Sequence, residues 1–283
     1  MLVKTADLLK EARKNKYAVG AFNIYNLEGA AAVVQTAEEL KSPVILQILP
    51  SGLRLGGRPL VALCLAMAKD AAVPVAVHLD HCPSEETLFF ALDCGFSSVM
   101  ADGSDLDYED NILFTKKVVT RARQHDAAVE AELGKLSGEE DGLSVDIRSA
   151  RMTDPEQAAG FVKETEVDAL AVCIGNVHGK YTQPPDLDFG RLAAIAEHVT
   201  IPLVLHGTSG LPDHMIEKSM EYGVCKFNVN TEVRSAYIEN IREHVEDNVK
   251  IELIDLMETS IEAMKIPIRS KIQLFCSTDR AKR

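Results

Sequence analysis

The strongest constraint on the fold of this 283-residue chain is the regular return of short apolar runs, each followed by a segment with helical spacing. Strands that alternate with helices predict a parallel sheet joined by crossover helices. Eight units, in a chain close to the roughly 250 residues typical of such a fold, predict a (β/α)8 barrel, or TIM barrel, of the α/β class. The strands are expected at 18–23, 43–48, 74–80, 97–102, 128–133, 169–175, 202–206 and 224–229.

Helical segments fill the intervals between these strands. Ser84, Asp154 and Asp188 stand where side chains cap the first turn of a helix. An open doubly wound sheet is the main alternative fold, but no GxGxxG motif follows the first strand. The helices are expected at 1–16, 27–40, 58–70, 84–94, 108–124, 155–165, 188–197, 212–221 and 231–245.

The chain continues beyond the eighth unit through an amphipathic stretch rich in Glu, Lys, Ile and Met. We predict a C-terminal helical extension at about 247–283, which packs on the barrel or on a neighbouring subunit. Because this stretch is too short for a domain of its own, residues 1–283 are expected to form one domain.

The formal net charge of −13 argues against nucleic acid or an anionic membrane as a partner, because the summed field would repel polyanions. An anionic metabolite would need local capture by backbone amides or a bound cation. The six cysteines are scattered without a CxxC pair and are expected to be reduced. With neither a signal peptide nor an apolar run of about 18 residues, we expect a cytoplasmic protein with no membrane span.

Metal-ligating and acid/base side chains stand at five of the eight predicted strand ends. The active site of a (β/α)8 barrel lies at the carboxyl ends of its strands, so these side chains are expected to converge. Three imidazoles come from three different ends: His81 after the third strand, His178 after the sixth and His206 after the seventh. Three protein ligands with one open position are the pattern of catalytic zinc, so the trio predicts a Zn²⁺ site.

Small and polar residues follow the last two strands. HGTSG at 206–210 follows the seventh strand, and NVNT at 228–231 follows the eighth and begins a helix. In this fold the corresponding loops often bind phosphate through backbone amides, and Gly179 stands where it would add another amide. The Gly-flanked acidic segment 134–142 is expected to be a mobile loop above the barrel mouth.

Six motifs together carry a family resemblance. In order and spacing they resemble the class II, metal-dependent aldolases of fructose bisphosphate or tagatose bisphosphate, and the resemblance spans 18 to about 246. The motifs are HLDH at 78–81, EAELG at 130–134, GEEDG at 138–142, GNVHGKY at 175–181, LVLHGTSG at 203–210 and KFNVNTE at 226–232.

The resemblance implies roles for the residues that match these motifs. It implies zinc on the three histidines, and Asp80 as the group that polarises or protonates the aldehyde oxygen and the C4 hydroxyl. Glu140 would be the base that takes a proton from the dihydroxyacetone phosphate carbon. An alternate or second metal position is implied at Asp102, Glu132 and Glu139.

The same resemblance implies a binding site for a phosphorylated sugar. A monovalent cation, Na⁺ or K⁺, is implied beside the phosphate, and a homodimer or homotetramer is the expected assembly. The residues that would bind the substrate's phosphate or hydroxyls are Asn23, Gly179, Gly207, Thr208, Ser209, Asn228, Asn230 and Thr231.

The implied chemistry is physically consistent. Reversible carbon–carbon cleavage needs an enediolate, which Zn²⁺ can stabilise as a Lewis acid, so no Schiff-base lysine is required. Lys226, the lysine nearest to a strand end, is expected to alternate with Asn228 and therefore not to reach the same site.

Departures from the family pattern leave the sugar open. Thr208 stands where Gly or Ala is usual, Ser137 where Gly is usual, and Leu49 where a Ser or Thr would contact the substrate. Asn230 resembles the residue of the fructose-bisphosphate members, whereas many tagatose-bisphosphate members carry Ala there, and this resemblance implies cleavage of fructose 1,6-bisphosphate to dihydroxyacetone phosphate and an aldehyde such as glyceraldehyde 3-phosphate. Tagatose bisphosphate or another phosphorylated ketose is the alternative, and a zinc-dependent sugar-phosphate epimerase or isomerase, or a non-catalytic subunit, represents other classes.

Overall fold

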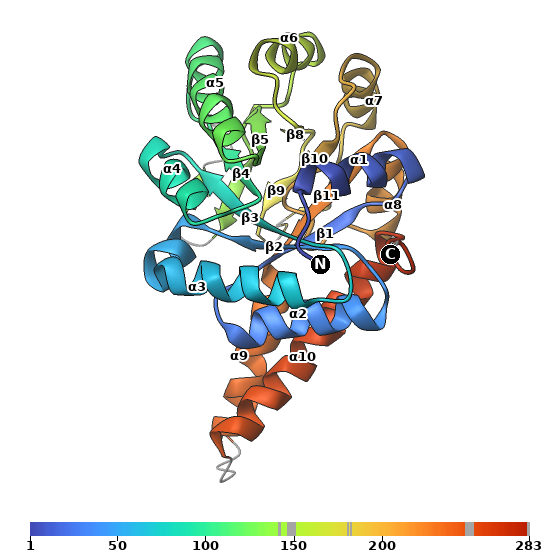
Figure 1. Ribbon diagram of the computed structural model, residues 1–283. Coiled ribbons are helices and arrows are strands. Elements are labelled where there is room, and N and C mark those ends of the chain that lie inside the picture. Colours follow the sequence, from blue (N-terminus) through green and yellow to red (C-terminus); the bar gives the residue numbers. More distant parts are fainter. Residues whose placement is uncertain (141–142, 146–150, 180, 182, 247–251, 282–283) are drawn as a thin grey trace.

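Eight parallel strands close into a barrel in the order β1-β11-β10-β8-β5-β4-β3-β2 (Figure 1). The computed structural model describes residues 1–140, 143–145, 151–179, 181, 183–246 and 252–281. All eight predicted strands are present, which confirms the (β/α)8 barrel. They are β1 Val19–Asn23, β2 Val44–Ile48, β3 Val75–Cys82, β4 Ser98–Ala101, β5 Ala128–Leu133, β8 Ala169–Val172, β10 Leu203–Leu205 and β11 Val224–Val229.

Helices surround this barrel and connect successive strands. The predicted caps form, since Ser84 accepts a hydrogen bond from the Thr87 amide, Asp154 from two amides and Asp188 from one. The helices are α1 Thr5–Asn15, α2 Leu27–Glu39, α3 Pro50–Asp70, α4 Glu85–Asp93, α5 Tyr108–Gln124, α6 Pro155–Thr165, α7 Phe189–His198, α8 Asp213–Glu221, α9 Thr231–Glu246 and α10 Leu253–Leu274.

Helix α3 begins well before residue 58, where the sequence pattern placed its start. Pro50 occupies the first turn, where its missing N–H costs no hydrogen bond. The helix bends at Gly57, which has a φ of 53°, and this bend explains why the pattern showed only the second half. The early start places the first turns of α3 at the mouth of the barrel, directly after β2.

The segment 134–142, predicted as an acidic loop, contains one short strand, β6, and a second short strand, β7, comes just after it. β6 Ser137–Glu140 pairs antiparallel with β7 Leu143–Val145 and parallel with β9 Val177–His178, so that the three form a small second sheet. The sixth barrel strand accordingly ends at Val172 rather than at 175, and the chain turns at Gly175, where φ is 103°. This sheet lies above the carboxyl ends of β5 and β8.

The inside of the barrel has two layers. At the amino-terminal end, Leu8 and Leu9 of α1 pack against Val19, Ile45 and other apolar residues that point inward. At the carboxyl end the inward positions are polar. On β3, for example, the inward residue Ala76 belongs to the apolar layer, and His78 and Asp80, which follow it on the same side of the strand, belong to the polar layer. Because side chains of a strand alternate with period two, a single strand supplies both layers.

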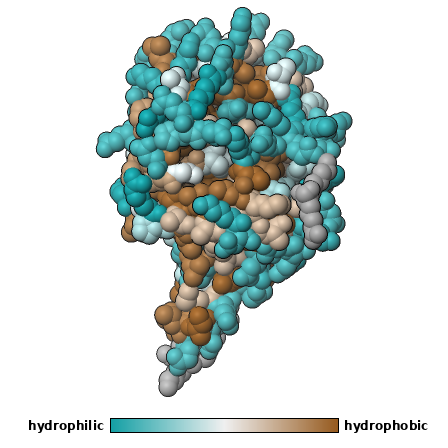
Figure 2. Space-filling model, viewed as in Figure 1, coloured by the Kyte–Doolittle hydropathy of each residue, from teal (hydrophilic) through white to brown (hydrophobic). Residues whose placement is uncertain are grey.

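Helices α9 and α10 extend the fold beyond the barrel, as predicted. α10 packs on α9 and α2. Phe275, the residue that follows α10, stacks on Phe227 of β11, with 4.8 Å between the ring centroids. The pair projects from the barrel, and Figure 2 shows apolar surface toward its far end, where Val245, Leu253 and Ile254 are exposed. Within the described residues, the helices lack the combination of length and apolar run needed to cross a bilayer.

Candidate active site

The carboxyl ends of the strands bring most of the predicted site residues together at the barrel mouth. Asp80 and His81 come from β3, His206 follows β10 and Asn228 lies on β11, and all four are buried. His178 comes from β9 in the small sheet. The geometry around these residues determines what the site can bind.

His81 is held in an unusual backbone conformation. Its φ is 42°, which L residues adopt at an energetic cost and which often marks a functional position. The bend turns its imidazole into the mouth, where Nδ1 lies 2.8 Å from a carboxylate oxygen of Asp102. This contact places the proton of the neutral ring on Nδ1 and leaves a lone pair on Nε2.

His206 is oriented in the complementary way. Its Nε2 lies 2.9 Å from a carboxylate oxygen of Glu130, so that the proton of the neutral ring belongs on Nε2 and Nδ1 carries the lone pair. The two lone-pair atoms, Nε2 of His81 and Nδ1 of His206, face each other at 2.7 Å. Two such nitrogens repel unless a proton or a metal cation lies between them.

The pKa shifts of the two imidazoles differ in sign. Burial lowers the pKa of His81, but Asp80, Asp102 and Glu132 outweigh burial and hold it well above its usual value. Burial and the neighbouring His81 push the pKa of His206 well below its usual value. The carboxylates around His81 therefore favour one positive charge at the histidine pair. A divalent cation bound there would also supply positive charge.

His178, the third histidine of the predicted trio, lies near the other two but belongs to neither group of described side chains that are close enough together to share a cation. Its ring centroid lies 4.9 Å from that of His81 and 6.1 Å from that of His206. The loop that carries it is tied to the β10 end, since the Asn176 amide donates to the His206 carbonyl at 3.0 Å. Gly207 permits this approach, because a Cβ there would lie 2.0 Å from the Val177 carbonyl oxygen.

Asp80 accepts hydrogen bonds from three amide side chains. The donors are Asn228 at 2.9 Å, Gln47 at 3.1 Å and Asn23 at 3.3 Å, from three other strands of the barrel. The carboxylate is fully buried, and these three donors hold it in one orientation. Asp80 is thus fixed beside the histidine pair in a position to hold or transfer a proton.

A second acidic group lies on the other side of His81. Oxygens of Asp102 and Glu132 lie 2.8 and 3.8 Å from His81 Nδ1. Burial and the nearby Asp102 raise the pKa of Glu132 well above its usual value, and within the described structure its Oε2 has no hydrogen-bond partner. Two three-residue groups can thus hold a cation, Asp80-His81-His206 and His81-Asp102-Glu132.

The predicted phosphate-binding residues surround the ends of β10 and β11. The Thr208 hydroxyl donates to the Asn228 carbonyl at 2.8 Å, so the extra side chain of this loop ties the two strand ends together. Only the backbone amide of Thr208 is then available to an anion. Ser209 donates to Glu232, and Tyr25 donates to Asn230 at 2.9 Å, while Thr231 begins α9.

Glu139 and Glu140 lie on β6 and pair with Ser144 and Leu143. Their side chains are outside the part of the chain that the structure describes, so their roles as metal ligand and base stay predictions. Their backbone lies beside β9, the strand that carries His178.

Comparison with known proteins identifies the family. The family model of class-II fructose-bisphosphate aldolase matches residues 3–280. The chain is also 40% identical to a fructose-bisphosphate aldolase of Thermus caldophilus, over 99% of this chain and 100% of that protein. The chain belongs to the class II fructose-bisphosphate aldolase family. It is therefore an aldolase, a carbon–carbon lyase.

Solved structures agree with this assignment. The YdjI aldolase of Escherichia coli K12 is 35% identical and superposes with a TM-score of 0.89 over 100% of both chains. A provisionally named fructose-1,6-bisphosphate aldolase of Coccidioides immitis is 33% identical, with a TM-score of 0.93 over 98% of each chain.

Three inward-facing polar residues of this aldolase were given no role in the site from the sequence: Gln47, Glu130 and Lys226. Lys226 was expected to point away from Asn228, and this expectation is wrong, because residues two apart on a strand share a side. Its Nζ lies 2.6 Å from the Asn228 side-chain oxygen and 3.0 Å from a Glu130 oxygen. Polar residues inside otherwise apolar strands were the available signal.

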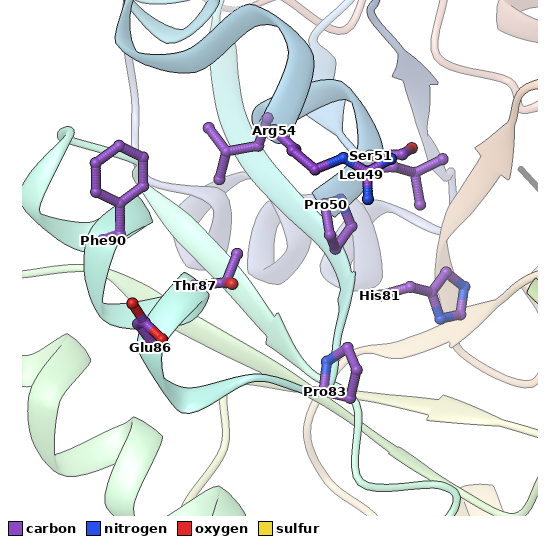
Figure 3. Close-up of a pocket in the computed structure, with 10 residues that line it drawn as sticks. Leu49, Pro50, Ser51, Arg54, His81, Pro83, Glu86, Thr87 and Phe90 are labelled. Carbon is purple, nitrogen blue, oxygen red and sulfur yellow. The ribbon is translucent and has the colours of Figure 1, made fainter. Parts of the chain in front are cut away.

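A large pocket opens beside the histidines of this aldolase. Its volume is about 710 Å³, and Figure 3 shows α3 residues on one side and α4 residues on the other, with His81 at one end. Leu49, where a Ser or Thr was expected, is buried at the start of α3 and lines this pocket. The pocket thus connects the predicted metal site with the first turns of α3.

Proposed function

We propose that this aldolase is zinc-dependent and cleaves a ketose bisphosphate, most directly fructose 1,6-bisphosphate, to dihydroxyacetone phosphate and glyceraldehyde 3-phosphate. The observation that carries the proposal is the pair of imidazole lone pairs that Asp102 and Glu130 turn toward one another beside Asp80. The name of the Thermus caldophilus relative supports the choice of sugar.

His81, His178 and His206 would hold the metal. Three nitrogen ligands suit catalytic zinc, and carboxylates behind two of them fix the ring tautomers, as in known metal sites. A bound zinc ion supplies Lewis-acid polarisation of the substrate's carbonyl. Asp102, Glu132 and Glu139 would form the alternate or second metal position.

Asp80 would manage the proton at the C4 hydroxyl. In cleavage it takes that proton as the bond between C3 and C4 breaks, and in the reverse direction it returns the proton to the aldehyde oxygen. Its three amide donors hold the carboxylate in place without supplying a competing acid. Glu140 would exchange the proton at the dihydroxyacetone phosphate carbon.

The phosphate would bind where the loops after β10 and β11 meet. Small residues permit close approach of an anion there. A monovalent cation, Na⁺ or K⁺, would offset the negative charge of the bound phosphate in a chain whose own net charge is −13. A homodimer or homotetramer is the proposed assembly. The proposed substrate contacts are Asn23, Gly179, Gly207, Thr208, Ser209, Asn228, Asn230 and Thr231.

A tagatose bisphosphate or another phosphorylated ketose is the second candidate, because Leu49 gives the pocket an apolar wall where a hydroxyl was expected. An epimerase or isomerase would rearrange the sugar phosphate at one of its carbon centres without cleaving it into two fragments. Product analysis therefore distinguishes the classes directly.

The test is turnover of several ketose phosphates by metal-depleted and zinc-reloaded protein, with products followed by NMR. We expect zinc-dependent formation of dihydroxyacetone phosphate and an aldehyde. An isomeric ketose as the only product would replace the aldolase proposal with an epimerase. A faster reaction with tagatose 1,6-bisphosphate than with the fructose substrate would change the proposed sugar.

A further inference from the structure

The C-terminal helix α10 is joined to the start of α9 by an ion pair. α10 runs from the far end of the projecting helix pair back toward the barrel (Figure 1), and Lys271 lies in its last turn. Nζ of Lys271 lies 3.1 Å from Oε1 of Glu232, which is in the first turn of α9 directly after NVNT. The two side chains are 14% and 30% exposed, so water and salt screen this pair less than a pair on the open surface.

The other carboxylate oxygen of Glu232 engages the predicted phosphate loop. The Ser209 hydroxyl, which is buried in HGTSG after β10, donates to Oε2 of Glu232 at 2.5 Å. A serine hydroxyl has a single proton, so while Glu232 accepts it the serine oxygen offers only lone pairs to any other group. Because Ser209 is one of the proposed phosphate contacts, Glu232 controls the orientation of that contact.

Glu232 also places a negative charge beside the proposed phosphate position. Burial opposes the ionised carboxylate, but the nearby Lys271 and the hydrogen bond from Ser209 outweigh burial and lower the pKa of Glu232. The carboxylate is therefore ionised at neutral pH, and like charges repel strongly where water is partly excluded. Lys271 offsets this charge, so the ion pair as a whole adds little net charge to the loop.

We infer that Lys271 is a positioning residue for the substrate's phosphate, and that it acts through Glu232 and Ser209. This inference rests on the proposed function, which puts the phosphate at the loops after β10 and β11. With Lys271 in place, Glu232 holds the Ser209 hydroxyl without repelling the phosphate. Without Lys271, the same carboxylate is an unbalanced anion next to the substrate. The C-terminal extension then contributes to substrate binding from outside the barrel.

Another lysine of α10 provides a matched comparison. Lys265 pairs with Glu39 at 3.2 Å and with Glu262 at 2.8 Å, and its side chain is 10% exposed, close to the value for Lys271. Glu39 is on α2, so this pair joins α10 to α2 rather than to the start of α9. Removing the Lys265 charge therefore tests the effect of a lost α10 ion pair away from the phosphate loop.

The experiment measures binding of dihydroxyacetone phosphate and of inorganic phosphate to the zinc-loaded enzyme by isothermal titration calorimetry. Steady-state cleavage of fructose 1,6-bisphosphate gives kcat and KM for the same samples, and a thermal scan reports stability. The variants are Lys271→Met, Glu232→Gln and the two combined, with Lys265→Met as the control. If Lys271→Met does not fold, Lys271→Gln, which keeps a hydrogen-bond donor and removes the charge, takes its place.

For Lys271→Met we expect Kd for dihydroxyacetone phosphate and KM for the sugar to rise by about tenfold or more, with a smaller change in kcat. Glu232→Gln should bind dihydroxyacetone phosphate at least as tightly as wild type, because a negative charge beside the phosphate is gone. The combined variant should bind nearly as tightly as wild type, since the two charges are removed together. Lys265→Met should lower the thermal midpoint without changing Kd.

An unchanged Kd in Lys271→Met would overturn the inference. A combined variant as weak as Lys271→Met would also overturn it, because the lysine would not act through Glu232, and so would weaker binding by Glu232→Gln than by wild type. An equal loss in Lys265→Met would show a general effect of α10 packing and overturn it as well. A zinc-loaded wild type that neither binds dihydroxyacetone phosphate nor cleaves the sugar would instead overturn the proposed function, and the inference with it.

Discussion

The two ends of the barrel interior are built from the same strands but meet opposite demands. At the amino-terminal end, Leu9 of α1 and the apolar residues around it are fully packed. At the carboxyl end, His81 has a positive φ and Glu132 keeps a buried oxygen without a hydrogen bond in the described structure. One end stabilises the fold, and the other retains unsatisfied groups that a ligand can satisfy.

The difference shows where this aldolase can tolerate change. An apolar layer contributes stability through burial and close packing, so substitutions there should affect folding more than chemistry. The polar layer above it costs free energy because buried charges must be paired. Lys226 and Glu130 lie at the boundary and form a buried ion pair at 3.0 Å, which pairs two of these charges.

The largest expected effect is at Asp80. Asp80→Ala should lower kcat for cleavage by about 10²–10⁴-fold, the usual contribution of general acid–base catalysis. The proposed histidine ligands remain, so the zinc content should change much less than turnover, while the thermal midpoint should fall because three buried amide donors lose their acceptor. Metal analysis, a thermal scan and steady-state kinetics check this together. Turnover equal to wild type would remove Asp80 from its proposed role.

The next largest effect is expected at the buried ion pair of Lys226 and Glu130. Lys226→Met leaves Glu130 buried without its cation and should reduce the free energy of unfolding by about 3–5 kcal/mol. Adding Glu130→Gln should restore much of that stability, while activity stays low because His206 loses its carboxylate. Denaturant unfolding of the single and double variants measures both. A single variant as stable as wild type would contradict the importance of the pair.

At the opposite end, Leu9→Ala should separate folding from function. Removing a fully buried leucine should lower the free energy of unfolding by about 2–5 kcal/mol. The geometry of the barrel mouth and the kinetic constants of the enzyme should be unchanged. Leu113→Ala, at a 60% exposed position of α5, is the control and should shift stability by less than about 0.5 kcal/mol. A selective loss of kcat in Leu9→Ala would show that the two ends are not independent.

Thr208 should show the smallest effect. Thr208→Ala removes one buried hydrogen bond to the Asn228 carbonyl and should cost about 1 kcal/mol of stability. Because the hydroxyl already points to backbone, KM for the phosphorylated substrate should not change, and Thr208→Ser should match wild type. A marked rise in KM for the alanine variant alone would assign the hydroxyl to the substrate.

The same comparison explains how far the sequence could be interpreted. The alternation of apolar runs and helical segments predicted all eight strands, because burial on both faces imposes a continuous apolar pattern. The histidines and Asp80 were found because they stand at strand ends. Gln47, Glu130 and Lys226 were not assigned a role, since an inward polar residue below a strand end is understood only when its partners on other strands are known.

The short strands β6 and β7 were missed for a different reason. β6 is the polar sequence SGEE and β7 has only three residues. β6 pairs on its other side with β9, which lies about forty positions later in the chain. The first half of α3 was missed because its Gly residues and Pro50 imitate a loop. In both cases tertiary contacts outweigh local propensity.

The most direct test of the metal site is titration of zinc into metal-depleted protein, with activity and bound metal measured on the same samples. We expect turnover to be absent without metal and to rise in proportion to bound zinc, and His81→Ala to bind much less and regain nothing. Full turnover by the metal-depleted wild type, with no zinc detected, would contradict a metal centre at the three histidines.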